Sequence, residues 1–331
     1  MAAAAGSVWR DQNMPEKNKI ISIEEHFWTA NLRDRYTGYA QVASHHPTKQ
    51  LDDLGELRLR QMDEAGINFQ IISHMQPGTQ TMDPENAVKF AREANDTLYE
   101  AMRAHPTRFG GFAEIPTPDP KAAADEIERT VVKYGFKGAL VSGLTNGTFL
   151  DDKQFWGIFE RAQALDVPIY LHPAIPHPAV MEAYYNDYKP KGFPTGAVLW
   201  GFMAEMGLQA IRLMQSGVFE KYPKLKFILG HLGESIPFML WRCDWLYRKV
   251  FDQSGCADLF REHFYVTTSG NFSNSALTCA LTEMGSDKIM FAVDWPFNSN
   301  LEAVSFLNNA PIGEEDRQKI FHHNAARLLR L

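Results

Sequence analysis

The chain has 331 residues, of which 45% are hydrophobic and 22% are charged, a balance typical of globular proteins. Its formal net charge is −7 and it carries no run of Lys and Arg, which argues against nucleic acid and anionic membrane surfaces as partners. The three cysteines, Cys243, Cys256 and Cys279, are odd in number and lack metal-type spacing, so we expect a reducing compartment and a cytoplasmic protein.

The N-terminal segment contains an Ala run followed by charges and a Pro. It lacks the apolar core of a signal peptide, so we expect a flexible tail over 1–18 and a single domain over 19–331. No apolar stretch in the chain is long enough for a transmembrane helix.

Eight short apolar runs, rich in β-branched and aromatic residues, recur along the chain and predict strands. They are Lys19–Glu24, Asn68–Ser73, Gly110–Ile115, Lys137–Val141, Val167–Leu171, Lys226–Gly230, His263–Thr268 and Lys288–Val293. Helical periodicity occupies Leu54–Ala65, Pro84–His105, Pro120–Tyr134, Lys153–Leu165, Ala204–Tyr222, Glu234–Val250, Asn274–Met284 and Glu314–Leu331.

This alternation of apolar strands and helices predicts an α/β fold with a parallel sheet covered by helices, and eight such units predict a closed (β/α)₈ TIM barrel. A doubly wound open sheet is the alternative, but the Gly-rich phosphate turn after the first strand is missing. The two longest connections, Phe27–Asp53 and Pro173–Gly201, follow strands 1 and 5. Both belong to the end of a barrel where active sites are built.

The end of the first strand carries Glu24, Glu25 and His26. Because residues two apart in a strand share a face, we expect Glu24 and His26 to point together and Glu25 to point away.

Three further strands end in residues of the same chemistry, namely His172, His231 and Asp294. A single His at a strand end is more often structural than a ligand, and an Asp after a strand is often a helix cap. The joint placement of carboxylates and imidazoles at four strand tips is what predicts a metal site, and these groups suit zinc, manganese or iron.

Several motifs then point to a known family. They are Glu-Glu-His-Phe at 24–27, Ala-Asn-Asp-Thr-Leu at 94–98, Gly-Phe-Lys-Gly at 135–138, Leu-His-Pro at 171–173, Gly-Val-Phe-Glu-Lys-Tyr-Pro at 217–223, Gly-His-Leu-Gly-Glu at 230–234, Thr-Thr-Ser-Gly-Asn-Phe at 267–272 and Asp-Trp-Pro at 294–296. From about Ile20 to the C-terminus the chain resembles the decarboxylase branch of the amidohydrolase superfamily. That branch includes the aminocarboxymuconate semialdehyde, γ-resorcylate, 2,3-dihydroxybenzoate, salicylate and 5-carboxyvanillate decarboxylases.

The resemblance implies Glu24, His26, His172 and Asp294 as ligands of one divalent ion, either zinc, manganese or magnesium, and no organic cofactor. Many members of the superfamily carry His-x-His where this chain has an acidic first ligand. The fourth strand ends Leu140–Ser142, without the carboxylated Lys that bridges two metals, which favours a single ion.

The resemblance also implies decarboxylation of a small aromatic carboxylate with an ortho hydroxyl group. Asp294 is then the acid that protonates the ring carbon. His231 and Glu234 could form an acid–base pair, although Glu234 could also cap the following helix.

Arg58 and Arg242 are the candidates to bind the substrate carboxylate, and Arg60 could replace Arg58. In similar decarboxylases an Arg in the context of Arg242 reaches the neighbouring subunit's site, which implies a homodimer or homotetramer. Four aromatic residues adjoin the ligands in sequence and either line an apolar substrate pocket or pack in the core. They are Phe27, Trp28, Trp295 and Phe297.

Two other functions stay open from the sequence. A metal-dependent hydrolase of a lactone or related cyclic substrate would share the ligands and use a metal-bound water, with Asp294 as its base. A non-catalytic barrel would be expected to lack a ligand, and none is missing here.

Overall fold

The computed structural model describes residues 19–36, 48–190, 194–251 and 255–331, so the predicted tail over 1–18 lies outside the described residues. Each of the eight predicted runs overlaps a strand, with bounds that differ by up to three residues, and the third is divided into two short strands. The strands are β1 (Ile21–Phe27), β2 (Phe69–His74), β3 (Phe109–Gly111), β4 (Ala113–Glu114), β5 (Ala139–Ser142), β6 (Ile169–His172), β7 (Phe227–Leu229), β8 (Phe264–Thr267) and β9 (Ile289–Met290).

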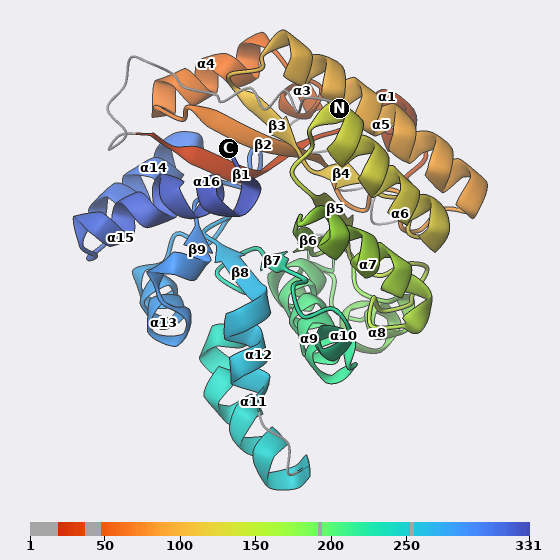
Figure 1. Ribbon diagram of the computed structural model, residues 1–331, viewed down its shortest axis with the longest axis vertical. Helices are drawn as coiled ribbons and strands as arrows, with labels where there is room; N and C mark the ends of the chain where they lie inside the picture. Colours follow the sequence, from red (N-terminus) through yellow and green to blue (C-terminus); the bar gives the residue numbers. More distant parts are fainter. Residues whose placement is uncertain (1–18, 37–47, 191–193, 252–254) are drawn as a thin grey trace, which may run out of the picture.

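All strand pairs are parallel and follow chain order, as β1-β2-β3 and β4-β5-β6-β7-β8-β9. Phe112 lies between β3 and β4 and donates its N–H to the carbonyl of Ile72 at 2.9 Å. On the opposite side, a parallel bridge between Glu25 and Trp295 connects the segment after β9 to β1. These contacts join the strands into a ring surrounded by helices, the predicted (β/α)₈ architecture (Figure 1).

The predicted helical segments are all helical. They contain α4 (Glu56–Ala65), α5 (Pro84–Ala104), α6 (Pro120–Arg129) with η2 (Thr130–Tyr134), η3 (Lys153–Phe155) with α7 (Trp156–Leu165), α9 (Phe202–Gln215), α10 (Val218–Lys221), α11 (Ile236–Phe251), α13 (Asn274–Met284), and α15 (Glu314–Gln318) with η8 (Lys319–His323) and α16 (Asn324–Leu329). In α5, the Asp83 side chain caps the first turn by accepting the N–H of Asn86, and Pro84 opens the helix.

Other helices were not predicted. They are α1 (Ala30–Arg33), α3 (Thr48–Leu51), α8 (Pro178–Val180), η4 (Met181–Tyr185), η6 (Ala197–Gly201), α12 (Cys256–His263), η7 (Ser286–Lys288) and α14 (Asn300–Asn309). Most of them are short pieces inside the long connections or second helices within one strand-to-strand unit. No helix in the described part of the chain combines the length and apolar character needed to cross a membrane.

The core has two layers separated by the strands. Inside the ring, side chains such as Ile23, Phe112 and Tyr170 pack against one another. Between strands and helices lies the larger cluster, which includes Phe227 of β7 and Phe264 of β8. Alternation along each strand therefore decides whether a residue faces the barrel interior or the helices.

Asn95 on α5 connects three elements inside the helix layer and is almost fully buried. Its Nδ2 donates to the carbonyl of Glu114 and to Glu126 Oε1, both at 2.8 Å, and its Oδ1 accepts the Glu114 N–H at 2.9 Å. The side chain thus satisfies buried polar groups of β4 and α6 that have strong desolvation costs.

We expect Asn95→Ala to lower the free energy of unfolding by roughly 2–4 kcal/mol, because it leaves several buried polar groups without partners. Urea denaturation followed by circular dichroism measures the change. Asn309→Ala is the matched control, since exposed Asn309 contacts only residues of its own helix turn. Equal stability of the two variants would contradict the role assigned to Asn95.

Candidate metal centre

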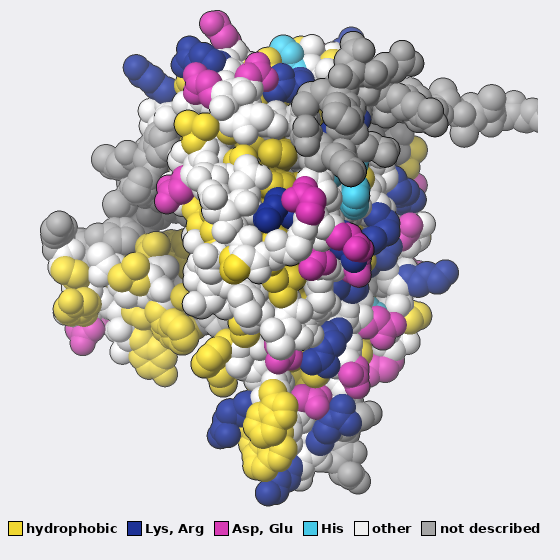
Figure 2. All heavy atoms as spheres, turned by 90° about the vertical axis from the view of Figure 1, so that its left-hand side faces the viewer, with side chains coloured by type: hydrophobic (Ala, Val, Ile, Leu, Met, Phe, Trp, Pro, Cys, Tyr) yellow, Lys and Arg dark blue, Asp and Glu magenta, His cyan; other side chains and the backbone are white. Residues whose placement is uncertain are grey.

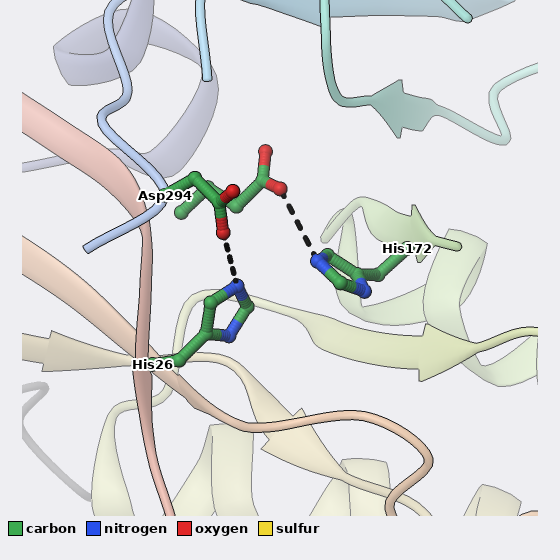
Figure 3. A group of neighbouring side chains, drawn as sticks. His26, His172 and Asp294 are labelled. Carbon is green, nitrogen blue, oxygen red and sulfur yellow. Dashed lines mark ion pairs between the residues drawn. The ribbon is translucent and has the colours of Figure 1, made fainter. Parts of the chain in front are cut away.

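Four predicted ligands meet at one end of the barrel. One ligand atom each from Glu24, His26, His172 and Asp294 lies within 4.8 Å of the others. His26 Nε2 is 3.2 Å from Asp294 Oδ1, and His172 Nε2 is 3.4 Å from Glu24 Oε1. Figure 3 shows His26, His172 and Asp294 pointing toward one another from separate parts of the barrel. The structure thus brings together the four residues that the family resemblance implied as ligands.

The first strand reaches the site through an irregularity. Its pairing register with β2 shifts between Ser22 and Glu25. Glu24 and His26 both face the ring interior at the site, whereas Glu25 faces the other way and accepts a hydrogen bond from the Ser22 hydroxyl. The prediction that the Glu25 side chain points away from those of Glu24 and His26 is confirmed.

Hydrogen-bonding neighbours orient the side chains of the proposed ligands, and the sequence analysis did not identify these neighbours. The hydroxyls of Tyr170 and Thr267 donate to Glu24 Oε2, with the Thr267 contact at 3.1 Å. His172 Nδ1 lies 2.7 Å from the carbonyl of Pro173, which leaves its Nε2 for the cluster. Tyr170 lies two residues before His172 in β6, so both side chains point to the same side of the strand. Strand alternation could therefore have identified Tyr170.

The cluster fits a divalent metal ion. Two imidazole nitrogens and two carboxylate oxygens form a donor set that suits zinc, manganese or iron. Glu24 and His26 are fully buried, yet Glu24 Oε1 and His26 Nε2 have no hydrogen-bond partner among the described residues. Buried polar atoms without partners are rare, and a shared cation would satisfy both.

The electrostatics of the cluster support the same assignment. Burial alone would raise the pKa of Glu24, but the nearby His231 and His172 hold it well below its usual range. Burial also acts to raise the pKa of Asp294, but the nearby imidazoles of His231 and His26 outweigh it and lower that pKa. Burial lowers the pKa of His26, which favours its neutral, metal-binding form.

His231 and Glu234 lie in an unusual left-handed turn. Residues 231–235 all have positive φ, with values of 52° at His231, 59° at Leu232 and 52° at Glu234. This turn brings His231 Nδ1 to 2.6 Å from Glu234 Oε1. Glu234 lies ahead of the first residue of α11, Ile236, and the observed contact of its side chain is with the imidazole.

The opposite edge of the His231 ring, which carries Nε2, points toward the cluster. Its Nε2 lies 3.8 Å from Glu24 Oε1 and 3.9 Å from Asp294 Oδ2. Burial would lower the pKa of His231, but the carboxylates of Glu234, Glu24 and Asp294 outweigh it and raise the pKa well above its usual value. His231 is therefore placed to hold a proton beside Asp294.

Asp294 is held by its own loop as well. Asn298 Nδ2 donates to Asp294 Oδ2 at 3.1 Å. Gly270 approaches so closely that an added Cβ would lie 3.3 Å from Asp294 Oδ2 and 3.2 Å from His231 Cδ2. The sequence analysis selected neither residue, although Gly270 lies within the Thr-Thr-Ser-Gly-Asn-Phe motif.

Arg58, a predicted substrate-binding residue, lies behind the cluster, and its role in substrate binding stays a prediction. Arg58 is fully buried, and its guanidinium donates to the carbonyls of His26 at 2.6 Å and Asp53 at 3.0 Å. Its Cζ also lies 4.1 Å from the centroid of the Trp295 ring. The side chain is therefore committed to the main chain behind the site. Arg60, its possible replacement, is exposed and pairs with Glu64 of the same helix.

The four aromatic candidates divide into two groups. Phe27 and Trp295 belong to the cluster between strands and helices, and Trp28 packs against Leu51 and Met75. For these three residues the structure shows core packing, the alternative to pocket lining. Phe27 adjoins His26 along the strand, so its side chain points to the opposite side. Phe297 is 37% exposed, and its ring centroid lies 6.1 Å from that of His26, so it alone adjoins the cluster.

Arg242 lies on α11, the helix that projects from the barrel at the bottom of Figure 1. Its side chain is exposed. The structure thus leaves Arg242 available to a neighbouring molecule, and its role stays a prediction.

The fold and the cluster define a metal-site barrel of the amidohydrolase type. The model of the Amidohydrolase family matches residues 24–331, so the chain belongs to this family. It is 41% identical over 328 residues to the γ-resorcylate decarboxylase of Polaromonas sp., covering 95% of this chain and 99% of that protein. The predicted family and enzyme class, a carboxy-lyase related to amidohydrolases, are confirmed.

Solved structures agree in fold. A dihydroxybenzoic acid decarboxylase from Polaromonas sp., with bound manganese and the inhibitor 2-nitroresorcinol, matches with a TM-score of 0.85 and 40% identity over 95% of this chain and 97% of that chain. A 2,6-dihydroxybenzoate decarboxylase complexed with 2,6-dihydroxybenzoate matches with a TM-score of 0.84 and 35% identity over 95% of this chain and 100% of that chain.

Removal of divalent metal with EDTA should lower the melting temperature, and Mn²⁺ should restore it, because the metal-free site buries carboxylates without a cation. Mn²⁺ at about 100 times its Kd would add about 2.7 kcal/mol to the free energy of unfolding. Differential scanning fluorimetry measures this shift. His172→Ala should abolish most of it, whereas His263→Ala should retain it, since buried His263 contacts the Leu225 carbonyl instead. Equal shifts in both variants would argue against the site.

Proposed function

We propose that this chain is a metal-dependent, non-oxidative decarboxylase of 2,6-dihydroxybenzoate (γ-resorcylate) or a closely related ortho-hydroxylated aromatic acid. The observation that carries the proposal is the convergence of the four-residue cluster with the His231–Glu234 pair at one end of the barrel. Similar proteins act on 2,6-dihydroxybenzoate and bind manganese, so Mn²⁺ is the proposed ion.

When bound, the divalent ion would supply positive charge to the carboxylate and ortho-hydroxyl oxygens of the substrate. Asp294 donates a proton to the ring carbon that bears the carboxylate, since loss of CO₂ without this proton would leave an unstable aryl carbanion. The bond to the carboxylate then breaks, its electron pair returns to the ring, and CO₂ leaves. Because the protonated ring accepts these electrons, the reaction needs no organic cofactor.

His231 supplies the proton that Asp294 transfers. Glu234 binds Nδ1 and so fixes the orientation of the imidazole, which directs Nε2 toward Asp294 Oδ2. After transfer, His231 regains a proton from water, because its side chain is 20% exposed. Phe297 lies beside the cluster, where its ring can contact the aromatic substrate.

The carboxylate of the substrate needs a cation as well, and Arg242 of a second subunit is our candidate. Arg242 shares one face of α11 with Phe238, Trp241 and Trp245, which are all exposed. In Figure 2 the apolar rings of this helix stand out among charged side chains at the bottom of the molecule. Exposed aromatic residues around an Arg are typical of protein interfaces, so we propose a homo-oligomer, either a dimer or a tetramer, built on this face.

Incubation of the Mn²⁺-loaded protein with 2,6-dihydroxybenzoate in D₂O should release CO₂ and place deuterium at the vacated ring carbon, as NMR would detect. Salicylate, 2,3-dihydroxybenzoate, 5-carboxyvanillate and aryl lactones complete the panel. Asp294→Asn should lower turnover at least roughly 100-fold, with a smaller loss of Mn²⁺ affinity. Lactone opening with every benzoate intact would instead favour a hydrolase, and near-normal turnover of the variant would remove Asp294 as the acid.

Mixing two inactive variants tests the role of Arg242. Arg242→Ala retains its metal site and Asp294→Asn retains its Arg, so a mixed dimer contains one complete site. Random exchange of subunits at equal amounts should restore roughly a quarter of the wild-type activity in a two-fold symmetric dimer. No recovery, although sedimentation shows mixed oligomers, would mean that Arg242 does not act across the interface.

A further inference from the structure

Glu25 lies between the ligands Glu24 and His26 in sequence, but it faces away from them and is fully buried. Its Oε1 accepts the N–H of Val293, and its Oε2 accepts the N–H of Trp295, both at 3.1 Å. These two amides belong to the residues on either side of Asp294. One carboxylate therefore spans the backbone after β9 that presents Asp294, the proposed ligand.

That backbone needs external support. Asp294 has a φ of 69°, in the left-handed region that non-glycine residues rarely adopt. Its own N–H donates to the carbonyl of Glu24 at 2.9 Å. Three successive amides, 293 to 295, are thus held by two adjacent residues of β1.

The connection continues on the other side of Glu25. The N–H of His26 donates to the carbonyl of Trp295 at 2.7 Å, while Arg58 donates to the carbonyl of His26 at 2.6 Å and covers the Trp295 ring. Burial raises the pKa of Glu25 to about 8, while the Ser22 hydroxyl, the two amides and the nearby Arg58 guanidinium act in the opposite direction. The result is a buried clamp, formed by Glu25 and Arg58, that ties the backbones carrying the ligands His26 and Asp294.

We infer that Glu25 is a positioning residue whose carboxylate, supported by Arg58, fixes Asp294 relative to His26 and so sets the geometry of the metal cluster. This inference rests on the proposed function of Asp294 as ligand and acid. The two carboxylate oxygens match the two amide donors, and the 3.2 Å separation of His26 Nε2 from Asp294 Oδ1 depends on that match. A side-chain amide could accept only one of the two N–H groups and would direct its own N–H groups at the other.

Glu25→Gln tests the inference. We expect the Mn²⁺ Kd, measured by calorimetric titration of the metal-free protein, to rise roughly 10- to 100-fold, as is typical when a partner of a metal ligand is lost, with kcat falling more than KM rises. Glu114→Gln is the matched control, since Glu114 is also buried on a barrel strand and accepts a main-chain N–H, from Thr79 at 2.8 Å, but makes no contact with the 293–295 segment. Its Kd should stay within twofold of wild type.

A Glu25→Gln protein that melts at a lower temperature but binds Mn²⁺ as tightly as wild type would overturn the inference, because Glu25 would then be merely structural. If Glu25→Gln does not fold, Glu25→Asp serves instead. It retains the charge and both oxygens but withdraws them by one methylene, and an unchanged Kd would again overturn the inference. Failure of the proposed function is separate: wild type would then bind Mn²⁺ with this dependence on Glu25 and leave every benzoate intact.

Discussion

The convergence of one buried and one partly buried carboxylate within a small cluster is the constraint on which this structure depends. Glu24 and Asp294 lie with two imidazoles at a single point, and buried charge of one sign is strongly unfavourable without compensation. Nearby imidazoles offset part of this charge, and hydroxyl donors decide which oxygen of Glu24 faces the cluster. Tyr170 and Thr267 occupy one oxygen of Glu24, and the other oxygen is left facing the cluster. Such a preorganised set of acceptors is what a divalent ion requires.

The backbone at the barrel mouth contributes as much as the side chains. Asp294 and the five consecutive residues 231–235 all have positive φ, and Gly233 is the one glycine among them. Each non-glycine residue of this kind costs about 1–2 kcal/mol. Such conformations persist where neighbouring structure fixes them. Here the barrel fixes them: Leu232 donates its N–H to the carbonyl of Thr267 at 2.7 Å, and Ser269 accepts the N–H of His231 at 3.0 Å. The strain concentrates at the residues proposed to move the proton.

The alternation of side chains along each strand explains which parts of the fold and the site could be predicted from the sequence. The residues of the cluster could be selected because they stand at strand ends, and alternation placed Glu24 and His26 on the same side; the family resemblance then implied which four are ligands. The same alternation predicts that Phe27 points away from the pocket. It also predicts that Tyr170 points to the same side of the strand as His172. The burial of Arg58 was not predicted for another reason: it depends on the packing of α4 against the barrel, which no local pattern encodes.

The left-handed turn at 231–235 could not be predicted from the sequence either. It contains Gly233, but Leu232 and Ser235 have no local preference for positive φ. Only the tertiary contacts of the neighbouring strand select it, and they also bring His231 against Glu234. The sequence could therefore propose this pair by spacing but could not derive the turn that produces it.

The placement of Arg58 has a further consequence for how the site is completed. Its guanidinium is fully buried and donates to main-chain carbonyls, so its visible role is structural. Of the two arginines proposed to bind the substrate carboxylate, Arg242 is the exposed one, on a helix that projects away from its own barrel. The proposed metal ligands and the proposed proton relay thus belong to one chain, while the proposed anion partner is presented outward. A site divided in this way would couple catalysis to assembly, because a single subunit would hold the ion and the acid but lack the cation that orients the departing carboxylate.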